Sequence, residues 1–543
     1  MLNGTYVMRR YLLSAFVLVV VAVLSFGYGL QAGVRKTPIF ELVVKTVRTL
    51  KPEKKVESAP QMHLDMSDRQ LLDSTILPLH QREIKVTNDE GKPLPLLAIA
   101  SAGGDQAVVL GSNGTLFRLA TDTCATSECL HQIGRLTRPD GTVLDDIYDL
   151  LAVEIDGKRE WFVSYGQMGD VGFTKALVIS RFTPPAELDQ NEIIQIEPPF
   201  FRTDSFSLRH GHSARSAGGA MVYDPRTDEI VITIGDYSLN GIGNVFSGPI
   251  PPSQSPDTDL GKILRISRTT GDSRIISMGH RNPQGLSLSK DGELIATEHG
   301  PKGGDEINLI EVGKNYGWPY TSMGTLYNGY TFPEKPIQPG QVHGGYTPPI
   351  MAFMPNPGIS AVMHIEGFHP AWDGDLMVTS LRGQTLLRVR RWETGDYVEP
   401  IYIGDRIRDV DVIGKQMVLA TDGGKIILLN PVENLEMARS DTGLVNNMTA
   451  LESCGSCHNV ISATSTNNAP YLLNIVGRQI ASASDFTRYS DGLLAKADTA
   501  WDIDSLEQFL RSPQDFAPGT AMPDLDLSDA EIAELMELLP LLR

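Results

Sequence analysis

Short apolar segments alternate with polar or glycine-containing turns between about residue 95 and residue 435. Few segments in this region have apolar residues at the spacing of an amphipathic helix. The recurring unit is a strand, a turn and a second strand. It occurs six times, at residues 107–119, 160–182, 229–266, 293–310, 375–389 and 416–430. Four-stranded sheets stacked around an axis leave only short edges, so the repeats predict an all-β propeller with six blades; a β-sandwich is the alternative.

The pattern changes after Pro431, where helical spacing returns at residues 504–511 and 528–539. The second of these segments begins with Ser528, and Glu531 follows three residues later, which is the pattern of a capping box. We therefore predict a propeller over residues 76–435 and a small all-α domain over residues 436–543.

The N-terminus contains an apolar run from Tyr11 to Leu30, about the 20 residues needed to cross a bilayer, and Arg9 and Arg10 precede it. The run has no polar face, which predicts a transmembrane or signal helix within residues 1–33. No small-x-small cleavage site follows, which favours an uncleaved anchor with residues 34–75 as a tether. We expect a periplasmic protein held at the inner membrane, or one secreted to the periplasm if the segment is cleaved.

Charge and cysteine content narrow the classes of partner. The chain has 66 acidic and 47 basic side chains and a formal net charge of −19, which would repel phosphate backbones and excludes nucleic acid as a partner. The same charge favours a protein partner with a basic patch. Cys124 and Cys129 bracket a four-residue loop, and outside the cytoplasm this spacing predicts a local disulfide.

The other two cysteines belong to the motif CGSCH, formed by Cys454, Cys457 and His458. This spacing lets two thiols bind the vinyl groups of a haem while the imidazole takes an axial position on the iron. A zinc half-site or a redox dithiol would be the alternative, but zinc needs two more ligands and no second Cys or His pair lies downstream. Met522, in the loop FAPGTAMPD, is well placed to supply the second axial ligand of one haem c.

The segment from about Val445 to the C-terminus resembles a class I cytochrome c of the mitochondrial type. The matching motifs, in the order of that family, are CGSCH, NAPYLLNIVGR, FTRYSDGL, WDIDSLEQFL and PGTAM. The resemblance implies that Pro470 packs against His458, that Trp501 hydrogen-bonds a haem propionate and that Met522 is the distal iron ligand.

Two loops of the predicted propeller carry polar groups on either side of one strand, GHRNPQGL at residues 279–286 and EHGP at residues 298–301. Arg281 and Asn282 offer a planar cation and an amide, which suit a flat ligand with carboxylate and carbonyl groups. Arg406 and Arg408 alternate along a predicted strand and so share a face, turned either to the central channel or to solvent.

The region from about residue 205 to 432 resembles the soluble quinoprotein sugar dehydrogenases, the aldose or glucose dehydrogenase family that uses pyrroloquinoline quinone (PQQ). The matching motifs are ITIGD, LGKILRI, MGHRNPQGL, EHGPKGGDEINLI, KNYGWP, FHPAWDGDLMVTSLRGQTLLRV and DRIRDV. By this resemblance, PQQ is held by Arg281, Asn282, Arg406, Arg408 and, where the family has a lysine, Arg382. Residues before 205 match poorly.

The resemblance also implies two calcium sites. The backbone carbonyls of Gly300 and Pro301 would bind the Ca²⁺ that polarises the quinone, since Ca²⁺ takes oxygen ligands. Asp305, Glu306 and Tyr316 match a second, structural Ca²⁺ loop, for which a capped turn is the alternative.

The chain departs from the family at the general base. The catalytic histidine of the family corresponds to Ser216, whose hydroxyl has essentially no affinity for a proton near neutral pH. His210 and His212 lie upstream in the same loop. We take His212, together with Arg281, as the candidate catalytic residues.

These features predict a membrane-tethered quinohaemoprotein that oxidises a sugar or related alcohol at PQQ. Electrons would pass to haem c and on to a respiratory cytochrome or oxidase. The alternative is a ligand-binding propeller without dehydrogenase activity, fused to an electron-transfer cytochrome; a third reading is an enzyme whose substrate, such as an aldehyde hydrate, needs no strong base.

Overall fold

The computed structural model divides the chain into two compact units, residues 1–431 and 432–543, described separately below. The structure describes residues 59–542, apart from residues 69, 73, 75–76, 125–126, 170–173, 186–191, 208–215, 241–248, 326–343, 393–394, 433–453, 456, 461–462, 467–468 and 526.

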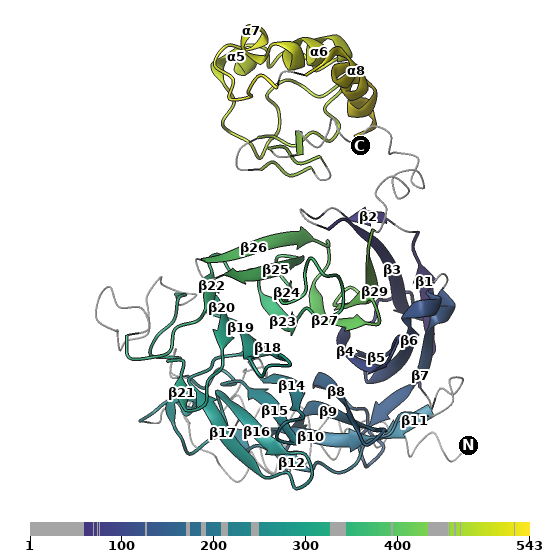
Figure 1. Cartoon of the computed structure of the whole chain (residues 1–543), viewed down its shortest axis with the longest axis vertical. Helices are drawn as coiled ribbons and strands as arrows, with labels where there is room; N and C mark the ends of the chain where they lie inside the picture. Colours follow the sequence, from purple (N-terminus) through teal and green to yellow (C-terminus); the bar gives the residue numbers. More distant parts are fainter. Residues whose placement is uncertain are drawn as a thin grey trace, which may run out of the picture. The chain divides into compact units, whose positions relative to one another are not determined.

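The first unit consists of six sheets arranged around a central axis (Figure 1). The second to fourth sheets along the chain begin with inner strands β4, β8 and β14. The second sheet contains β4 (Leu96–Gly103), β5 (Gln106–Gly111), β6 (Thr115–Ala120), β7 (Leu130–Thr137) and β11 (Glu192–Gln195). The third contains β8 (Ile147–Ile155), β9 (Lys158–Met168), β10 (Thr174–Phe182), β12 (Phe201–Arg202) and β13 (Phe206–Ser207). The fourth contains β14 (Gly218–Asp224), β15 (Glu229–Ile234), β16 (Lys262–Ser267), β17 (Ser273–Met278) and β21 (Lys314–Asn315).

The remaining sheets complete the ring. The fifth contains β18 (Pro283–Leu288), β19 (Leu294–Glu298), β20 (Asp305–Leu309) and β22 (Met351–Phe353). The sixth contains β23 (Ile359–His364), β24 (Leu376–Ser380), β25 (Thr385–Trp392) and β26 (Gly395–Tyr402). The first joins both ends of the unit: β1 (Met62–Met66), β2 (Gln70–Leu72), β3 (Leu79–Asn88), β29 (Lys425–Pro431), β28 (Gln416–Thr421) and β27 (Ile407–Ile413). The predicted six-bladed propeller is confirmed.

The ring closes where β3 pairs antiparallel with β29, in a register that runs from Leu79 opposite Pro431 to Lys85 opposite Lys425. The structure differs here from the predicted tether over residues 34–75, because β1 and β2 are already part of the sheet. The reason is the alternation in β1, which packs Met62, Leu64 and Met66 against the buried core.

The predicted anchor over residues 1–33 lies outside the described residues. Among the described residues, no helix is both long and apolar enough to span a bilayer. The predicted disulfide between Cys124 and Cys129 is confirmed.

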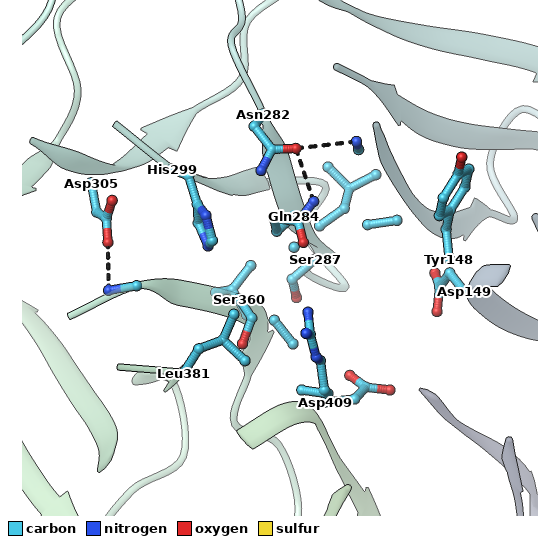
Figure 2. Close-up of a pocket in the computed structure, with 18 of the residues that line it drawn as sticks. Tyr148, Asp149, Asn282, Gln284, Ser287, His299, Asp305, Ser360, Leu381 and Asp409 are labelled. Carbon is cyan, nitrogen blue, oxygen red and sulfur yellow. Dashed lines mark hydrogen bonds between the residues drawn. The ribbon is translucent and has the colours of Figure 1, made fainter. Parts of the chain in front are cut away.

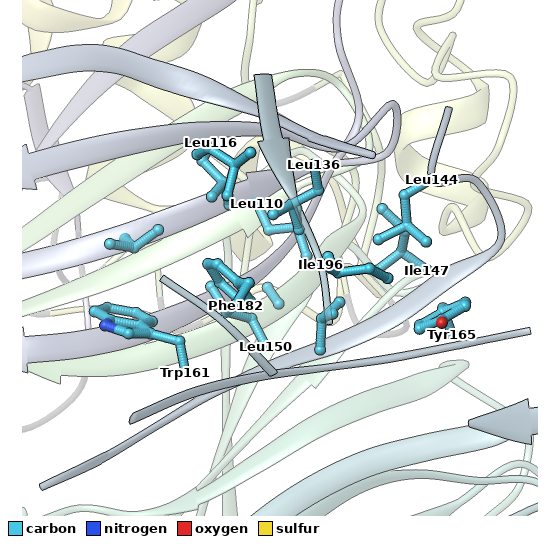
Figure 3. Packing of buried hydrophobic residues seen from close by; sticks show 14 of the residues in the cluster. Leu110, Leu116, Leu136, Leu144, Ile147, Leu150, Trp161, Tyr165, Phe182 and Ile196 are labelled. Atoms are coloured by element: carbon cyan, nitrogen blue, oxygen red, sulfur yellow. The ribbon is translucent and has the colours of Figure 1, made fainter. Parts of the chain in front are cut away.

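Apolar side chains fill the space between neighbouring sheets. Figure 3 shows one such cluster, in which Leu110 and Leu116 of the second sheet pack with Leu150, Trp161 and Phe182 of the third. Each fully buried aliphatic side chain contributes about 1.5–3 kcal/mol to stability. The sheets are therefore held face to face, which fixes the positions of the inner strands.

All six inner strands carry a register shift against their neighbour within the sheet, for example between Ile147 and Asp149 of β8 and between Ile407 and Asp409 of β27. At a bulge two residues oppose one, so a backbone N–H is released from the ladder and the strand bends. The released groups are available to side chains of the next blade.

The second unit is helical where it has regular structure. Its helices are α5 (Asp491–Leu494), α6 (Ile503–Arg511), α7 (Pro513–Phe516) and α8 (Asp529–Leu538), followed by a 3₁₀ turn at Leu539–Leu541. The capping box of Ser528 and Glu531 is present at the start of α8, and α6 begins with a second one, made by Asp502 and Ser505. The two helices predicted from periodicity are confirmed.

Candidate functional site

A cavity of about 1340 Å³ lies at the centre of the propeller, lined by the inner strands and the loops that precede them. Figure 2 shows part of its wall, with Asn282, Gln284, His299 and Asp305 on one side and Tyr148 and Asp149 on another. The cavity is lined by all five residues expected to bind PQQ: Arg281, Asn282, Arg382, Arg406 and Arg408. The fold thus brings together side chains that are up to 127 positions apart in the chain.

Arg281 and Asn282 are held by contacts with the backbone and with neighbouring side chains. The Arg281 Nη1 donates to the carbonyl of His299 at 2.8 Å, and its guanidinium lies 5.4 Å from the centre of the Trp318 ring. The Asn282 Oδ1 accepts from the N–H of Gly218 at 3.3 Å and from the Gln284 side chain at 2.9 Å. These contacts fix one rim of the cavity.

Arg406 and Arg408 share a single acidic partner. Their Nε atoms lie 2.8 and 2.6 Å from the two carboxylate oxygens of Asp422. Among the described residues, neither Arg281 nor Arg382 forms an ion pair. Two guanidinium groups without an ion-pair partner in the described part of the chain suit an anionic ligand.

Gly300 and Pro301 line both this cavity and a small enclosed one of about 10 Å³ beside it. Glu298 and Glu306, opposite each other on β19 and β20, line the small cavity together with Tyr316. Burial, together with the charge of Glu298, raises the pKa of Glu306 to about 8. A divalent cation would relieve the repulsion between the carboxylates of Glu298 and Glu306. Carboxylates and backbone carbonyls are the oxygen donors that Ca²⁺ takes.

The structure does not bring Asp305, Glu306 and Tyr316 to one point. Asp305 lines the large cavity, where its carboxylate accepts from the N–H groups of Gly300, Gly358 and Ile359 at 3.0, 2.7 and 3.1 Å. Consecutive strand residues point to opposite faces, so Glu306 turns to the small cavity instead. Within the described part of the chain, no group of three or more His, Cys, Asp or Glu side chains could hold a metal ion.

Ser216, which the resemblance aligns with the family's catalytic histidine, lies on the wall of the large cavity. Its φ of 63° is in the left-handed region, which side-chain-bearing residues rarely adopt, and the N–H of Tyr237 donates to its carbonyl at 2.9 Å. Gly235 makes room for this carbonyl, since an added Cβ there would lie 2.0 Å from it. His210 and His212 lie outside the described residues, so the structure places neither.

Several polar residues of the cavity were missed by reasoning from the sequence. The Nε2 atom of His299 is shielded from solvent and has no hydrogen-bond partner among the described residues. Asp149, Asp409 and Asp411 also line the cavity. The EHGP motif contained a signal for His299, but nothing in the local sequence distinguishes the aspartates from ordinary strand residues.

The second unit contains a cavity of about 510 Å³. Cys454, Cys457, His458 and Met522 all line it, and most of the other lining side chains are apolar, among them Leu472, Ile475, Leu506, Phe509 and Leu535. The ring nitrogen Nδ1 of His458 donates to the carbonyl of Pro470 at 2.6 Å, which leaves Nε2 for a metal.

Trp501 also lines this cavity, and its ring stacks on Phe516 at 5.5 Å between centroids. The thiols, imidazole and thioether predicted to hold haem therefore meet around one apolar space.

Part of the chain is 34% identical, over 94 residues, to a cytochrome c homolog of Rickettsia conorii; the match covers 17% of this chain and 50% of that protein. A longer match, 27% identical over 296 residues, is to the aldose sugar dehydrogenase YliI of Escherichia coli, covering 50% of this chain and 71% of the relative. A third, 34% identical over 134 residues, is to the quinoprotein glucose dehydrogenase B of Acinetobacter calcoaceticus, covering 21% of this chain and 28% of that protein.

The fold is shared with a solved structure. The crystal structure of the soluble aldose sugar dehydrogenase of Escherichia coli, in the apo-form, matches 68% of this chain and all of its own, with a TM-score of 0.50 and 21% identity. Residues 156–428, half of the sequence, match the family model for glucose/sorbosone dehydrogenase. The chain therefore belongs to the glucose/sorbosone dehydrogenase family.

Proposed function

We propose that the protein is a PQQ-dependent dehydrogenase that oxidises a sugar or a related alcohol and passes the electrons to its own haem c. The convergence of four arginines and Asn282 on one central cavity carries this proposal. A flat ligand with several carboxylates and carbonyls would use all five side chains, because guanidinium groups bind such oxygens in a planar fork. The quinoprotein relative from Acinetobacter calcoaceticus supports the choice of cofactor.

When bound, PQQ would supply an ortho-quinone that accepts hydride from the substrate. Arg281, Arg382, Arg406 and Arg408 would balance its carboxylate charges, and Asn282 would hydrogen-bond a carbonyl. Because six sheets surround the cavity, the substrate would approach it along the propeller axis. Water would be excluded from the reacting atoms once both ligands are in place.

A calcium ion would fit between the two cavities. The carbonyl oxygens of Gly300 and Pro301 would face it, and the buried carboxylates of Glu298 and Glu306 would balance its charge. Its role would be to polarise a cofactor oxygen.

One covalently bound haem c would occupy the second unit, with Cys454 and Cys457 as thioether donors and His458 and Met522 as iron ligands. Trp501 would hydrogen-bond a propionate. The haem would take electrons one at a time and pass them to a respiratory cytochrome or oxidase. A net charge of −19 suits a basic acceptor protein.

The expected location is the periplasm, at the inner membrane, through the apolar run from Tyr11 to Leu30. Covalent attachment of both redox units to one chain would keep the acceptor at a high effective concentration.

A second candidate is a ligand-binding propeller without dehydrogenase activity. Ser216 favours it, because the family's general base is missing from its usual position.

Reconstitution separates the two candidates. The purified protein, with haem attached, would be supplied with PQQ and Ca²⁺. The absorption of the reduced haem would be followed with a panel of aldoses and alcohols, and PQQ binding would be measured by calorimetry. We expect at least one sugar to reduce the haem only when PQQ is present. Binding of PQQ without reduction of the haem by any substrate would support the ligand-binding propeller. Failure to bind PQQ would contradict the assignment of the arginines as PQQ ligands in both candidate functions.

A further inference from the structure

A buried carboxylate, an indole and a guanidinium form a chain of contacts beside the large cavity. The indole Nε1 of Trp318 donates to the carboxylate of Asp236 at 2.8 Å, and the Arg281 guanidinium lies over the same indole, 5.4 Å from the ring centre. The backbone N–H of Asp236 also donates to the Arg281 carbonyl at 2.8 Å. Asp236 and Trp318 are buried, whereas Arg281 lines the cavity. Two buried side chains from separate loops thus meet the residue proposed to bind PQQ.

Three of the motifs identified in the sequence supply these residues: ITIGD, KNYGWP and MGHRNPQGL. Strand β21 pairs in parallel with β17, with Asn315 opposite Met278, which places the KNYGWP segment beside the GHRN loop. Glycine permits this approach, because a Cβ added to Gly279 would lie 2.5 Å from the backbone nitrogen of Gly317. The N–H of Trp318 donates to the Gly279 carbonyl at 3.0 Å, so the backbone sets the position of the ring.

The carboxylate of Asp236 accepts three hydrogen bonds. Besides the indole N–H, it accepts from the N–H of Ser238 at 2.7 Å and from the side-chain amide of Asn240 at 2.9 Å. A carboxylate accepts on both oxygens, whereas an amide in its place would turn an N–H group toward one of these donors. The backbone of Trp318 is held as well, since its carbonyl accepts from the Ser253 Oγ at 2.8 Å. The indole therefore has little freedom to turn.

Arg281 has few other contacts that could fix its guanidinium. Among the described residues, this group makes one side-chain hydrogen bond, from Nη1 to the His299 carbonyl at 2.8 Å, and one cation–π contact, with Trp318. An arginine side chain has several rotatable bonds, and their freedom is lost when it binds a ligand. The hydrogen bond holds one edge of the guanidinium, the ring holds its position, and most of its N–H donors remain for a carboxylate.

We propose that Asp236 and Trp318 are positioning residues for Arg281, which hold its guanidinium in place to bind a carboxylate of PQQ. This assignment rests on the proposed function. The aromatic ring attracts the cation, and the hydrogen bond to Asp236 keeps the ring in place and polarises it. Such preorganisation raises affinity, because less side-chain freedom is lost on binding. Neither Asp236 nor Trp318 lines the large cavity, so both act through Arg281.

The first test needs neither PQQ nor substrate. The chain has five tryptophans, so protein labelled with ¹⁵N-tryptophan gives few indole N–H resonances, and Trp318→Phe identifies the one that belongs to Trp318. We expect this N–H to exchange slowly with deuterated solvent and its resonance to move in Asp236→Asn. Rapid exchange, or a resonance that does not move, would refute the link between Trp318 and Asp236.

The second test measures PQQ affinity by calorimetry, on the PQQ-free protein with haem attached and Ca²⁺ present. Trp318→Leu removes the aromatic ring, and we expect the affinity to fall about 10- to 30-fold. Trp318→Phe keeps an aromatic ring and loses the indole N–H, so the affinity should fall less than about fivefold. An unchanged affinity in Trp318→Leu would overturn the proposal.

Trp372 provides a matched control. It is buried, and the Arg388 guanidinium lies 5.4 Å from its ring centre, but neither of these two residues lines the large cavity. Trp372→Leu should therefore lower the melting temperature and leave PQQ affinity unchanged. Equal losses of affinity in Trp318→Leu and Trp372→Leu, in step with their melting temperatures, would assign Trp318 to packing alone and contradict the proposal.

A residue that acts through Arg281 should have no effect once Arg281 is absent. Arg281→Ala should weaken PQQ binding, and adding Trp318→Leu to it should weaken binding less than about twofold further. Additive losses would count against the proposal. A loss of Ca²⁺ affinity with unchanged PQQ affinity would also count against it, since Trp318 lines the small cavity. If wild type binds no PQQ, the proposed function fails and the choice of ligand with it, whereas the indole resonance still decides whether Asp236 holds Trp318.

Discussion

The two units of this chain form their sites in opposite ways. In the second unit, three of the four predicted iron and thioether donors lie within five consecutive residues, and the cavity of about 510 Å³ forms around that motif. In the propeller, the cavity of about 1340 Å³ takes its polar groups from inner strands of different sheets. A site encoded by one motif can be recognised from its spacing. A site at a ring axis depends on how every blade is placed.

The largest effect, loss of covalent haem, is expected when the two thiols of the CGSCH motif are removed. This variant tests whether the site of the second unit depends on that motif alone. The double variant Cys454→Ala/Cys457→Ala should carry no covalent haem, because both thioether bonds are lost, while the propeller still binds PQQ. Haem staining of denaturing gels and calorimetry with PQQ would measure the two properties. Cys124→Ala/Cys129→Ala, which removes the propeller disulfide, is the control and should keep its haem. Covalent haem in the first variant would contradict the motif assignment.

PQQ binding in the propeller should be weakened strongly, but not abolished, by the loss of two of the residues that line the cavity. Arg406→Ala/Arg408→Ala removes two charge-assisted contacts, each about 1.5–3 kcal/mol, so PQQ affinity should fall at least about 100-fold. Calorimetric titration would measure the affinity. Arg274→Ala removes an exposed arginine of β17 that pairs with the buried Glu229 of β15, and it should leave the affinity unchanged. An equal loss in both variants would show that the cavity arginines act only through stability.

Within the second unit, a residue far from the CGSCH motif should tune the proposed haem site without being needed for haem attachment. Met522→Ala should leave haem covalently bound and lower its reduction potential, because a thioether ligand favours the reduced iron. Potentiometric titration monitored by absorption would measure the change. Met536, which packs in the same apolar cluster, provides the control: Met536→Ala should keep the wild-type potential. An unchanged potential in Met522→Ala would exclude it as an iron ligand.

The smallest effect concerns the stability of the propeller. Burial, followed by the charge of Asp409, raises the pKa of Asp411 from 3.8 to about 7 in the folded protein. A raised carboxyl pKa means that the folded state holds the proton more tightly, so this contribution to stability is present at low pH and is lost as the pH rises from 3.8 toward 7. The stability of wild type relative to Asp411→Asn should therefore fall over that range.

Urea unfolding at a series of pH values would measure this difference. A gap between wild type and Asp411→Asn that does not change with pH would show that Asp411 is not buried as a neutral acid. The result would also indicate whether the inner strands of the propeller tolerate charge at the axis.

Much of the fold could be predicted because its signals are local. Strand repeats gave the number of blades, and the capping box of Ser528 and Glu531 gave the start of α8. The N-terminal strands were not predicted because β1 has only five residues. Its alternation of apolar and polar side chains indicates a strand only once Leu64 and Met66 are seen to pack against the core. The pairing of β3 with β29 joins the two ends of the propeller, a relation that no local pattern contains.

For the candidate sites, the sequence alone determined the CGSCH motif, the repeating pattern of strands and the serine at position 216. Only the tertiary structure decided that Arg281, Arg382 and Arg408 line one cavity, that Asp305 and Glu306 line different ones, and that Asp149 and Asp409 line the same one. The physical reason is that a propeller places the start of every inner strand at the same axis. Residues 260 positions apart thereby line one low-dielectric cavity, and their charges interact only because the fold brings them there.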